Sequence, residues 1–277
     1  MSQASGLATE QIIHENTLYA EPLAHIGSFP ITNSLMTSGV ALLIIVILGI
    51  AVSRKIKKVP TGLQNALEMI IEMFLNLFDS VTGSRQKSLK FAPFVLAFFF
   101  FVLINNWMGI LPGVGSIGQI IQTADGKFFI PYLRGGTADL NTTLALATIG
   151  VVVSHIVGVI AVGAWNYFNK FINIKAILEI PKKVLKDPTI LIVNPIKVFV
   201  GFIEIISELA KVASLSFRLF GNVFAGEVLL ASMSAILAFG LPLPFLFLEI
   251  LVGLIQALIF AMLILTYLTI NTTAEEH

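Results

Sequence analysis

The sequence contains no cysteine and few charged residues. The absence of cysteine excludes disulfide bonds and thiolate metal sites. Only 12% of the 277 residues are charged and 56% are hydrophobic, whereas a soluble domain usually has about a quarter of its residues charged. The four histidines show none of the close spacings that place metal ligands on one helix face. The chain is therefore expected to lie in a lipid membrane.

The N-terminal segment lacks the features of a cleaved signal peptide. Residues 1–34 contain no Lys or Arg, and no basic stretch precedes an apolar core. They do contain three glutamates. We therefore expect residues 1–34 to remain as a polar tail on the outer side of the membrane.

Long apolar runs alternate with short polar segments along the rest of the chain. A helix needs about 20 apolar residues to cross the hydrocarbon layer. The runs that meet this length predict five transmembrane segments, at 35–53, 91–111, 139–163, 195–236 and 245–270. The loop at 112–138 is rich in Gly and Pro and is expected to be irregular.

The segment 60–83 has a different pattern. It opens on Pro60, which suits the first turn of a helix. Its apolar residues recur at helical spacing, with Glu68, Glu72 and Asp79 between them. This pattern predicts an amphipathic helix that lies at the inner face of the membrane.

The basic residues give an orientation. Thirteen of the 17 Lys and Arg fall in or beside the segments 54–90 and 164–194, and only Lys127 and Arg134 lie between the second and third spans. Basic residues concentrate in cytoplasmic loops. The sequence therefore predicts an outer N-terminus, an inner loop at 164–194 and a C-terminus in the cytoplasm.

The fourth predicted span is too long to stand upright. About 40 residues separate Pro195 from the run GLPLP at residues 240–244. At about 1.5 Å per residue such a helix is roughly 60 Å long, twice the thickness of the hydrocarbon layer. It must tilt strongly, lie along the membrane or extend beyond it. The predicted fold is thus an all-α polytopic membrane protein that ends in a long, tilted helical hairpin.

Polar residues form stripes on both helices of this hairpin. The stripe on the fourth span, at spacings of 3, 4, 3, 4 and 4, consists of Glu204, Ser207, Lys211, Ser214, Arg218 and Asn222. Glu249, Gln256 and Tyr267 form a second stripe on the last span. A hairpin would place Gln256 at the depth of Asn222, with Glu227 and Glu249 near the outer end.

Arg218 decides which chemistry these stripes can perform. An arginine at the centre of a bilayer costs about 2.5–3.5 kcal/mol on insertion scales, so it is retained mainly where its charge is used. Partly buried carboxylates can relay protons, but a guanidinium cannot lose its proton. Arg218 is therefore expected to be a barrier between an inner and an outer polar path. The lone His155 is expected to have a structural role, because no partner for it is evident.

Three segments resemble one known family. The runs SLSFRLFGNVFAGE, LIQALIFAMLILTYLTI and ADLNTTLALA are similar to the a subunit of the membrane sector of the F-type ATP synthase, and the tail NTTAEEH is similar to its bacterial members. The resemblance implies a non-catalytic stator subunit in the bacterial plasma (inner) membrane. It also implies two offset half-channels beside a rotating ring of c subunits. Arg218 would pair with the passing carboxylate of the ring and prevent a short circuit.

The resemblance also assigns the other site residues and the partners. Glu204 and Ser207 match the inner half-channel. The residues that match the outer half-channel and its entrance are Asn222, Glu227, Glu249, Gln256, Asp139 and Asn141. How Glu227 and Glu249 share the outer path is open, because some members have His at the position of Glu249. The implied partners are the c ring with its ionisable carboxylates, the b-subunit stator stalk, the remaining synthase subunits and lipid. No cofactor, metal or nucleic acid is implied.

Two other classes of function are alternatives to the stator subunit. The first is a secondary transporter with an anion site at Arg218, although the chain shows no internal repeat of the kind that builds many transporters. The second is an intramembrane hydrolase, which no Ser–His or metal-ligand pair supports. The choice between proton and sodium is open, because the binding carboxylate is expected on the partner.

Overall fold

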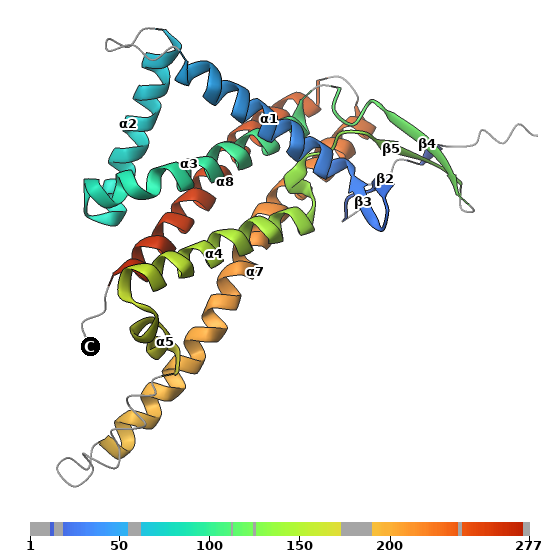
Figure 1. Cartoon of the computed structure of the whole chain (residues 1–277). Helices are drawn as coiled ribbons and strands as arrows, with labels where there is room; N and C mark the ends of the chain where they lie inside the picture. Colours follow the sequence, from blue (N-terminus) through green and yellow to red (C-terminus); the bar gives the residue numbers. More distant parts are fainter. Residues whose placement is uncertain are drawn as a thin grey trace, which may run out of the picture. The chain divides into compact units, whose positions relative to one another are not determined.

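The computed structural model describes residues 12–13, 19–54, 62–111, 113–123, 126–172, 190–237 and 240–273 (Figure 1). Most of the described chain is helical. The helices are α1 (Asn33–Ser53), α2 (Leu63–Thr82), α3 (Arg85–Ile110), α4 (Leu140–Val162), α5 (Ala164–Ile172), α7 (Ile190–Ile236) and α8 (Pro242–Thr272). Parts of several predicted segments lie outside the described ranges. These parts are Pro60, residues 1–11 and 14–18 of the outer tail, the centre of the inner loop 164–194 and the last four residues.

Four helices in the described ranges have the length and apolar composition to cross a membrane. These helices are α1, α3, α4 and α8, and they coincide with four of the five predicted spans. Helix α7 is not among them, and it has 47 residues, which gives a length of roughly 70 Å at the usual rise. Helix α7 is therefore longer than a simple span, as predicted, and its crossing of the membrane stays a prediction.

The predicted start of α7 at Pro195 is wrong. The helix begins at Ile190 and includes Pro195 in its second turn. A proline inside a helix removes one hydrogen bond, here the one to the carbonyl of Leu191, and crowds that carbonyl. So close to the end of a helix this is one lost bond, and the apolar run ILIV ahead of Asn194 continues the helical pattern.

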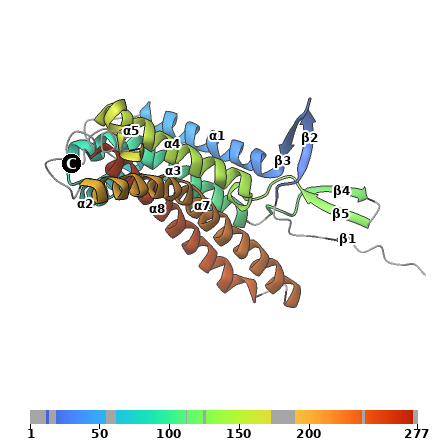
Figure 2. The ribbon, with the colours of Figure 1, turned by 90° about the horizontal axis from the view of Figure 1, so that it is seen from below.

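The mostly helical structure agrees with an all-α polytopic membrane protein, and the polar segments at the N-terminus and after α3 add short strands. The loop 112–138 contains β4 (Gly118–Thr123) paired antiparallel with β5 (Gly126–Pro131), and β1 (Ile12–Ile13) pairs parallel with β5. A second hairpin joins β2 (Pro22–Ile26) to β3 (Phe29–Thr32) (Figure 2). The runs QIIQ and KFFI favour strands because β-branched and aromatic residues suit a pleated surface.

The helices contribute to two compact units, each built from separate stretches of chain. The first unit consists of Met1–Ile50, Phe100–Thr142 and Phe220–Gln256. The second unit consists of Ala51–Phe99, Thr143–Leu219 and Ala257–His277.

Buried polar side chains hold the first unit together. Ser38 on α1 donates a hydrogen bond to Oδ1 of Asn105 on α3, at 3.1 Å. A Cβ on Gly136, in the short 3-10 helix η1 (Gly136–Ala138), would lie 2.3 Å from both of these side-chain oxygens. Asn106 donates to the carbonyl of Gly253 on α8 at 3.0 Å. The close approach of these elements therefore depends on the missing side chain of Gly136.

Apolar packing dominates the second unit. The rings of Phe98 on α3 and Phe260 on α8 stack with centroids 5.9 Å apart. Helix α2 buries Phe74 and Phe78, and the Phe74 ring lies 4.6 Å from that of Phe99. The predicted amphipathic helix is thus present with one face buried against α3, while its position at the inner face of a membrane stays a prediction.

The turn between α2 and α3 is held by charge. The guanidinium of Arg85 pairs with Glu72 at 2.8 Å and with Asp79 at 3.0 Å. Gly83 ends α2 in the left-handed region, at φ 66°, which glycine adopts without strain. The neighbouring Ser88 hydroxyl and the Arg85 guanidinium hold the pKa of Asp79 below its usual value. The carboxylate form of Asp79 is therefore favoured at this turn.

Candidate functional site

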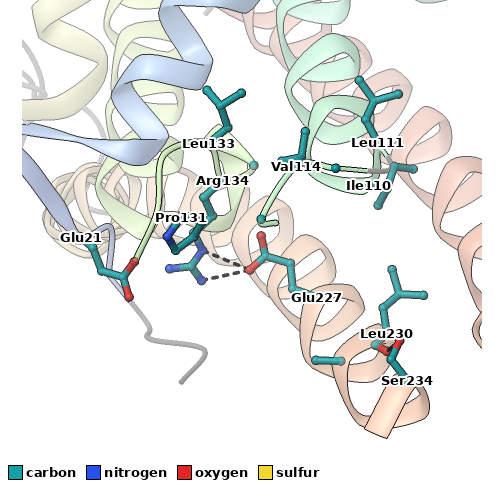
Figure 3. Close-up of a pocket in the computed structure, with 15 residues that line it drawn as sticks. Glu21, Ile110, Leu111, Val114, Pro131, Leu133, Arg134, Glu227, Leu230 and Ser234 are labelled. Atoms are coloured by element: carbon teal, nitrogen blue, oxygen red, sulfur yellow. Dashed lines mark hydrogen bonds and ion pairs between the residues drawn. The ribbon is translucent and has the colours of Figure 1, made fainter. Parts of the chain in front are cut away.

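A pocket of about 290 Å³ in the first unit brings together a guanidinium and two carboxylates. Its charged lining residues are Glu21, Arg134 and Glu227, and its apolar walls include Leu111 and Leu230. Figure 3 shows the guanidinium of Arg134 directed at the carboxylate of Glu227. Arg134 belongs to the segment between β5 and η1, and Glu227 belongs to α7.

The ion pair between Arg134 and Glu227 is nearly enclosed. Both Nε and Nη2 of Arg134 donate to Oε2 of Glu227, at 3.2 Å and 3.0 Å. The third guanidinium nitrogen, Nη1, donates to the carbonyl of Tyr19 at 3.2 Å. Only 9% of the Arg134 side chain and 18% of the Glu227 side chain are exposed. Because a guanidinium stays charged at all relevant pH values, it supplies a permanent counter-charge to Glu227.

Removing the positive partner of this pair should destabilise the first unit. In Arg134→Met the Glu227 carboxylate loses its counter-charge in an enclosed site, and breaking a buried pair in this way costs about 3–5 kcal/mol. The free energy of unfolding of the full chain in lipid, measured by denaturant titration, should fall by an amount of this order. Adding Glu227→Gln should recover most of the loss. Equal stabilities of Arg134→Met and the unmodified chain would contradict the pairing.

Glu249 on α8 approaches α7 at a glycine. Its side chain is buried, and a Cβ on Gly226 would lie 2.2 Å from the carboxyl carbon and both carboxyl oxygens of Glu249. The carboxyl therefore rests against the backbone of α7, in space that only glycine leaves open. Gly226 directly precedes Glu227 on α7. The Glu249 carboxyl therefore contacts α7 one residue before the position that carries the Glu227 carboxylate. Among the ion pairs of the described ranges, Glu227 takes part in one and Glu249 in none.

The hairpin register predicted for Asn222 and Gln256 is confirmed. Nδ2 of Asn222 on α7 donates to Oε1 of Gln256 on α8 at 2.7 Å. Gln256 is only 3% exposed, whereas Asn222 is exposed. The pair is thus a polar link between the two helices with one end at the surface.

Asp139 is the cap of α4. Its carboxylate accepts hydrogen bonds from the backbone N–H of Asn141 and the hydroxyl of Thr142, both at 3.2 Å, as an aspartate at an N-cap does. It also accepts from the Ser34 hydroxyl at 3.2 Å. Asn141 is exposed and donates from Nδ2 to the same carboxylate. These contacts account for both residues locally, and their role at a channel entrance stays a prediction.

Arg218 lies on an exposed face of α7 in the second unit. Leu215, Ser216 and Leu219 are buried, whereas Ser214, Phe217 and Arg218 are exposed. Nη2 of Arg218 donates to Oγ of Ser214 at 3.4 Å. The ion pairs found within the described ranges do not include Arg218.

Apolar and small residues are also exposed on α7 beside Arg218. Phe217 is 60% exposed and Ile206 is 53% exposed, and Ala210 and Ser214 lie between them at helical spacing. Small residues on a helix surface let another helix approach closely. The guanidinium of Arg218 is therefore set in a surface that suits the packing of a further helix.

The inner end of the predicted stripe differs from expectation. Glu204 and Ser207 are half-buried, and the carboxylate of Glu208, which the stripe omitted, contacts another helix. Glu208 lies 2.7 Å from Nζ of Lys211 and 3.3 Å from Nε2 of His155 on α4. The expectation that His155 has no evident partner is wrong, because α4 and α7 bring the two residues together.

Comparisons with known proteins agree with the sequence motifs. The family described as "ATP synthase A chain" matches residues 34–269. "ATP synthase subunit a" of Geobacter sp. (strain M21) is 33% identical over 224 residues, 81% of this chain and 80% of the relative. The chloroplastic subunit a of Stigeoclonium helveticum is 31% identical over 88% of this chain and 85% of the relative. "ATP synthase subunit a" of Moorella thermoacetica is 28% identical over 88% of this chain and 92% of the relative. The resemblance seen in the motifs is thereby confirmed, and the chain belongs to the ATP synthase A chain family.

Proposed function

We propose that this chain is the proton-translocating stator subunit of an F-type ATP synthase. It supplies two offset half-channels to a rotating ring of c subunits, so that a proton gradient drives rotation and ATP synthesis. The chain itself is a membrane subunit, and catalysis occurs elsewhere in the complex. The observation that carries this proposal is Arg218, an exposed arginine on α7 with exposed apolar and small residues beside it.

The surroundings of Arg218 support a partner that brings its own carboxylate. Small and apolar residues around it suit a neighbouring helix, and a guanidinium at membrane depth requires a counter-charge. A carboxylate on the rotating ring meets this need for part of each turn. Since Arg218 cannot release a proton, it cannot carry one from the outer path to the inner path.

The outer path is assigned to the polar residues of the first unit. Asn222 and Gln256 link α7 to α8, and Glu227 and Glu249 lie further along the same hairpin. Because Arg134 neutralises Glu227, the proton carrier at this point is Glu249, whose carboxyl has no such counter-charge among the described residues. Asp139 and Asn141 mark the entrance. Glu204 and Ser207 are assigned to the inner path.

The orientation follows from the basic residues. The predicted inner loops carry most of the Lys and Arg, which places the N-terminus outside and the C-terminus in the cytoplasm of a bacterial cell. In this orientation α7 is the fourth of five membrane-crossing helices, strongly tilted beside the c ring. The amphipathic α2 lies at the inner face, where the b-subunit stalk and other subunits are available as partners.

Reconstitution tests the proposal directly. Vesicles that contain the assembled complex should make ATP when a proton gradient is imposed, and vesicles that contain this chain alone should transport nothing. A secondary transporter with an anion site at Arg218 would instead move an anionic substrate without any partner. Transport by the chain alone would therefore overturn the stator assignment.

A further inference from the structure

A cluster of titratable side chains in the second unit lies apart from the residues assigned above. His155 on α4 is its centre. Its Nδ1 lies 2.5 Å from the hydroxyl of Tyr167 on α5, and its Nε2 lies 3.3 Å from Oε2 of Glu208 on α7. The other carboxylate oxygen of Glu208 accepts from Nζ of Lys211 at 2.7 Å. Both ring nitrogens of one histidine are thus engaged, one by a hydroxyl and one by a carboxylate.

The hydroxyl of Tyr167 fixes the arrangement of protons in this cluster. Burial, and then the charges of Glu208 and Glu204, raise the pKa of Tyr167 to about 12. Tyr167 therefore stays protonated, and its hydroxyl donates to Nδ1 when the His155 ring is neutral. The tautomer follows from that hydrogen bond, so Nε2 carries the ring proton and directs it at Glu208.

The same hydroxyl also permits a second state. When His155 takes up a proton, an N–H bond forms at Nδ1, and an O–H bond of a hydronium ion from the inner side breaks. The Tyr167 hydroxyl then turns and accepts from Nδ1, so no hydrogen bond is lost. The imidazolium then pairs with the Glu208 carboxylate, which Lys211 also contacts.

The position of the cluster suits an exchange point between water and membrane. A quarter of the His155 side chain and 22% of that of Lys211 are exposed, whereas Glu208 is 11% exposed. Along α7, Glu208 precedes Arg218 by ten residues, roughly 15 Å at the usual rise. Lys211 points its Nζ over the ring of Tyr267 on α8, 5.2 Å from the ring centre. The titratable groups around the pair are Tyr167 and Lys211, and Glu204 is near enough for its charge to act on Tyr167.

We propose that His155 is a proton-exchange group of the inner half-channel, with Glu208 and Tyr167 as positioning residues. The inference rests on the proposed function of the chain. It adds His155 to the inner path that is assigned to Glu204 and Ser207.

The test uses the assembled complex in vesicles whose cytoplasmic side faces the bath. ATP-driven proton pumping is measured as the bath pH is changed across the range in which histidines change charge, about pH 5 to 8. His155→Gln should lower the pumping rate per assembled complex by about tenfold or more, as loss of an acid–base group does. It should also flatten the pH profile. Glu208→Gln should have the same effect, and the double variant should be no slower than either single variant.

Controls separate this role from packing. His25→Gln changes an exposed histidine on β2 and should leave rate and profile unaltered. A purely structural role for the cluster would lower the amount of assembled complex but leave the rate per complex and its pH profile unchanged, and this result would overturn the inference. If His155→Gln does not assemble, the isosteric Glu208→Gln decides by the same criteria. Arg218→Ala in the same preparation tests the proposed function separately: pumping that survives it refutes that function, whatever the result at His155.

Discussion

Replacing Arg218 by alanine should abolish proton-driven ATP synthesis in the assembled complex. The alanine side chain offers no positive charge to the carboxylate of the ring, so nothing forces that carboxylate to release its proton at the inner path. It also removes the barrier between the two paths, so passive proton flow through the membrane sector should rise. Both effects are measurable in vesicles, by ATP yield after an imposed gradient and by the decay of that gradient.

Two further variants show whether the guanidinium itself is required. Arg218→Lys keeps a positive charge, but an ammonium sheds its proton far more readily than a guanidinium when it is buried. It should therefore support little synthesis. Arg54→Ala, at an exposed arginine that follows α1, should behave as the unmodified complex does. Synthesis by Arg218→Ala at more than a small fraction of the normal rate would remove the assigned role.

The second large effect is expected at Gly226. A methyl group added there occupies the space of the Glu249 carboxyl, because its Cβ would lie 2.2 Å from three atoms of that group. The carboxyl is the free end of a flexible side chain, so the protein should fold with the carboxyl displaced. Helix stability itself should not suffer, since alanine is favoured over glycine by about 0.5–1 kcal/mol inside a helix. Proton-driven synthesis should nevertheless fall by about tenfold or more, the usual loss when an acid–base group is misplaced.

The matched control for this variant is a second glycine-to-alanine change in the same unit. Gly39 lies on α1, and a Cβ there would meet no atom within 4 Å. Gly39→Ala should leave synthesis intact, whereas Glu249→Gln should reproduce the loss seen in Gly226→Ala. If Gly226→Ala keeps full activity while Glu249→Gln loses it, the carboxyl does not need the position it occupies against α7.

Local patterns in the sequence account for most of the helices. Apolar runs gave the cores of α1, α3, α4 and α8 because membrane helices are defined by length and composition. The first and last residues of these helices do not follow from composition in the same way. Helix α3 begins at Arg85 rather than near residue 91, since basic residues continue a helix beyond the hydrocarbon layer as readily as they end one. The strands β4 and β5 were not predicted, because the Gly and Pro of the loop 112–138 indicate irregular structure more strongly than the short runs of Ile and Phe indicate strands.

The site was predicted only where its residues share one helix or one hairpin. The link between Asn222 and Gln256 follows from helix register, and the structure contains the hydrogen bond between them. The partners of Glu227 and His155 do not follow from register. Arg134 comes from a segment 93 residues away, and Glu208 lies outside the stripe that its helix displays. Such contacts depend on how separate elements pack, which spacing within one element does not encode.

The exposed position of Arg218 has a consequence for biogenesis. If α7 crosses the membrane as proposed, the guanidinium confronts lipid until a partner covers that face, at a cost of about 2.5–3.5 kcal/mol on insertion scales. Docking of a partner that brings a counter-charge would remove this cost. The charge that is proposed to keep the proton paths apart would thus also favour assembly.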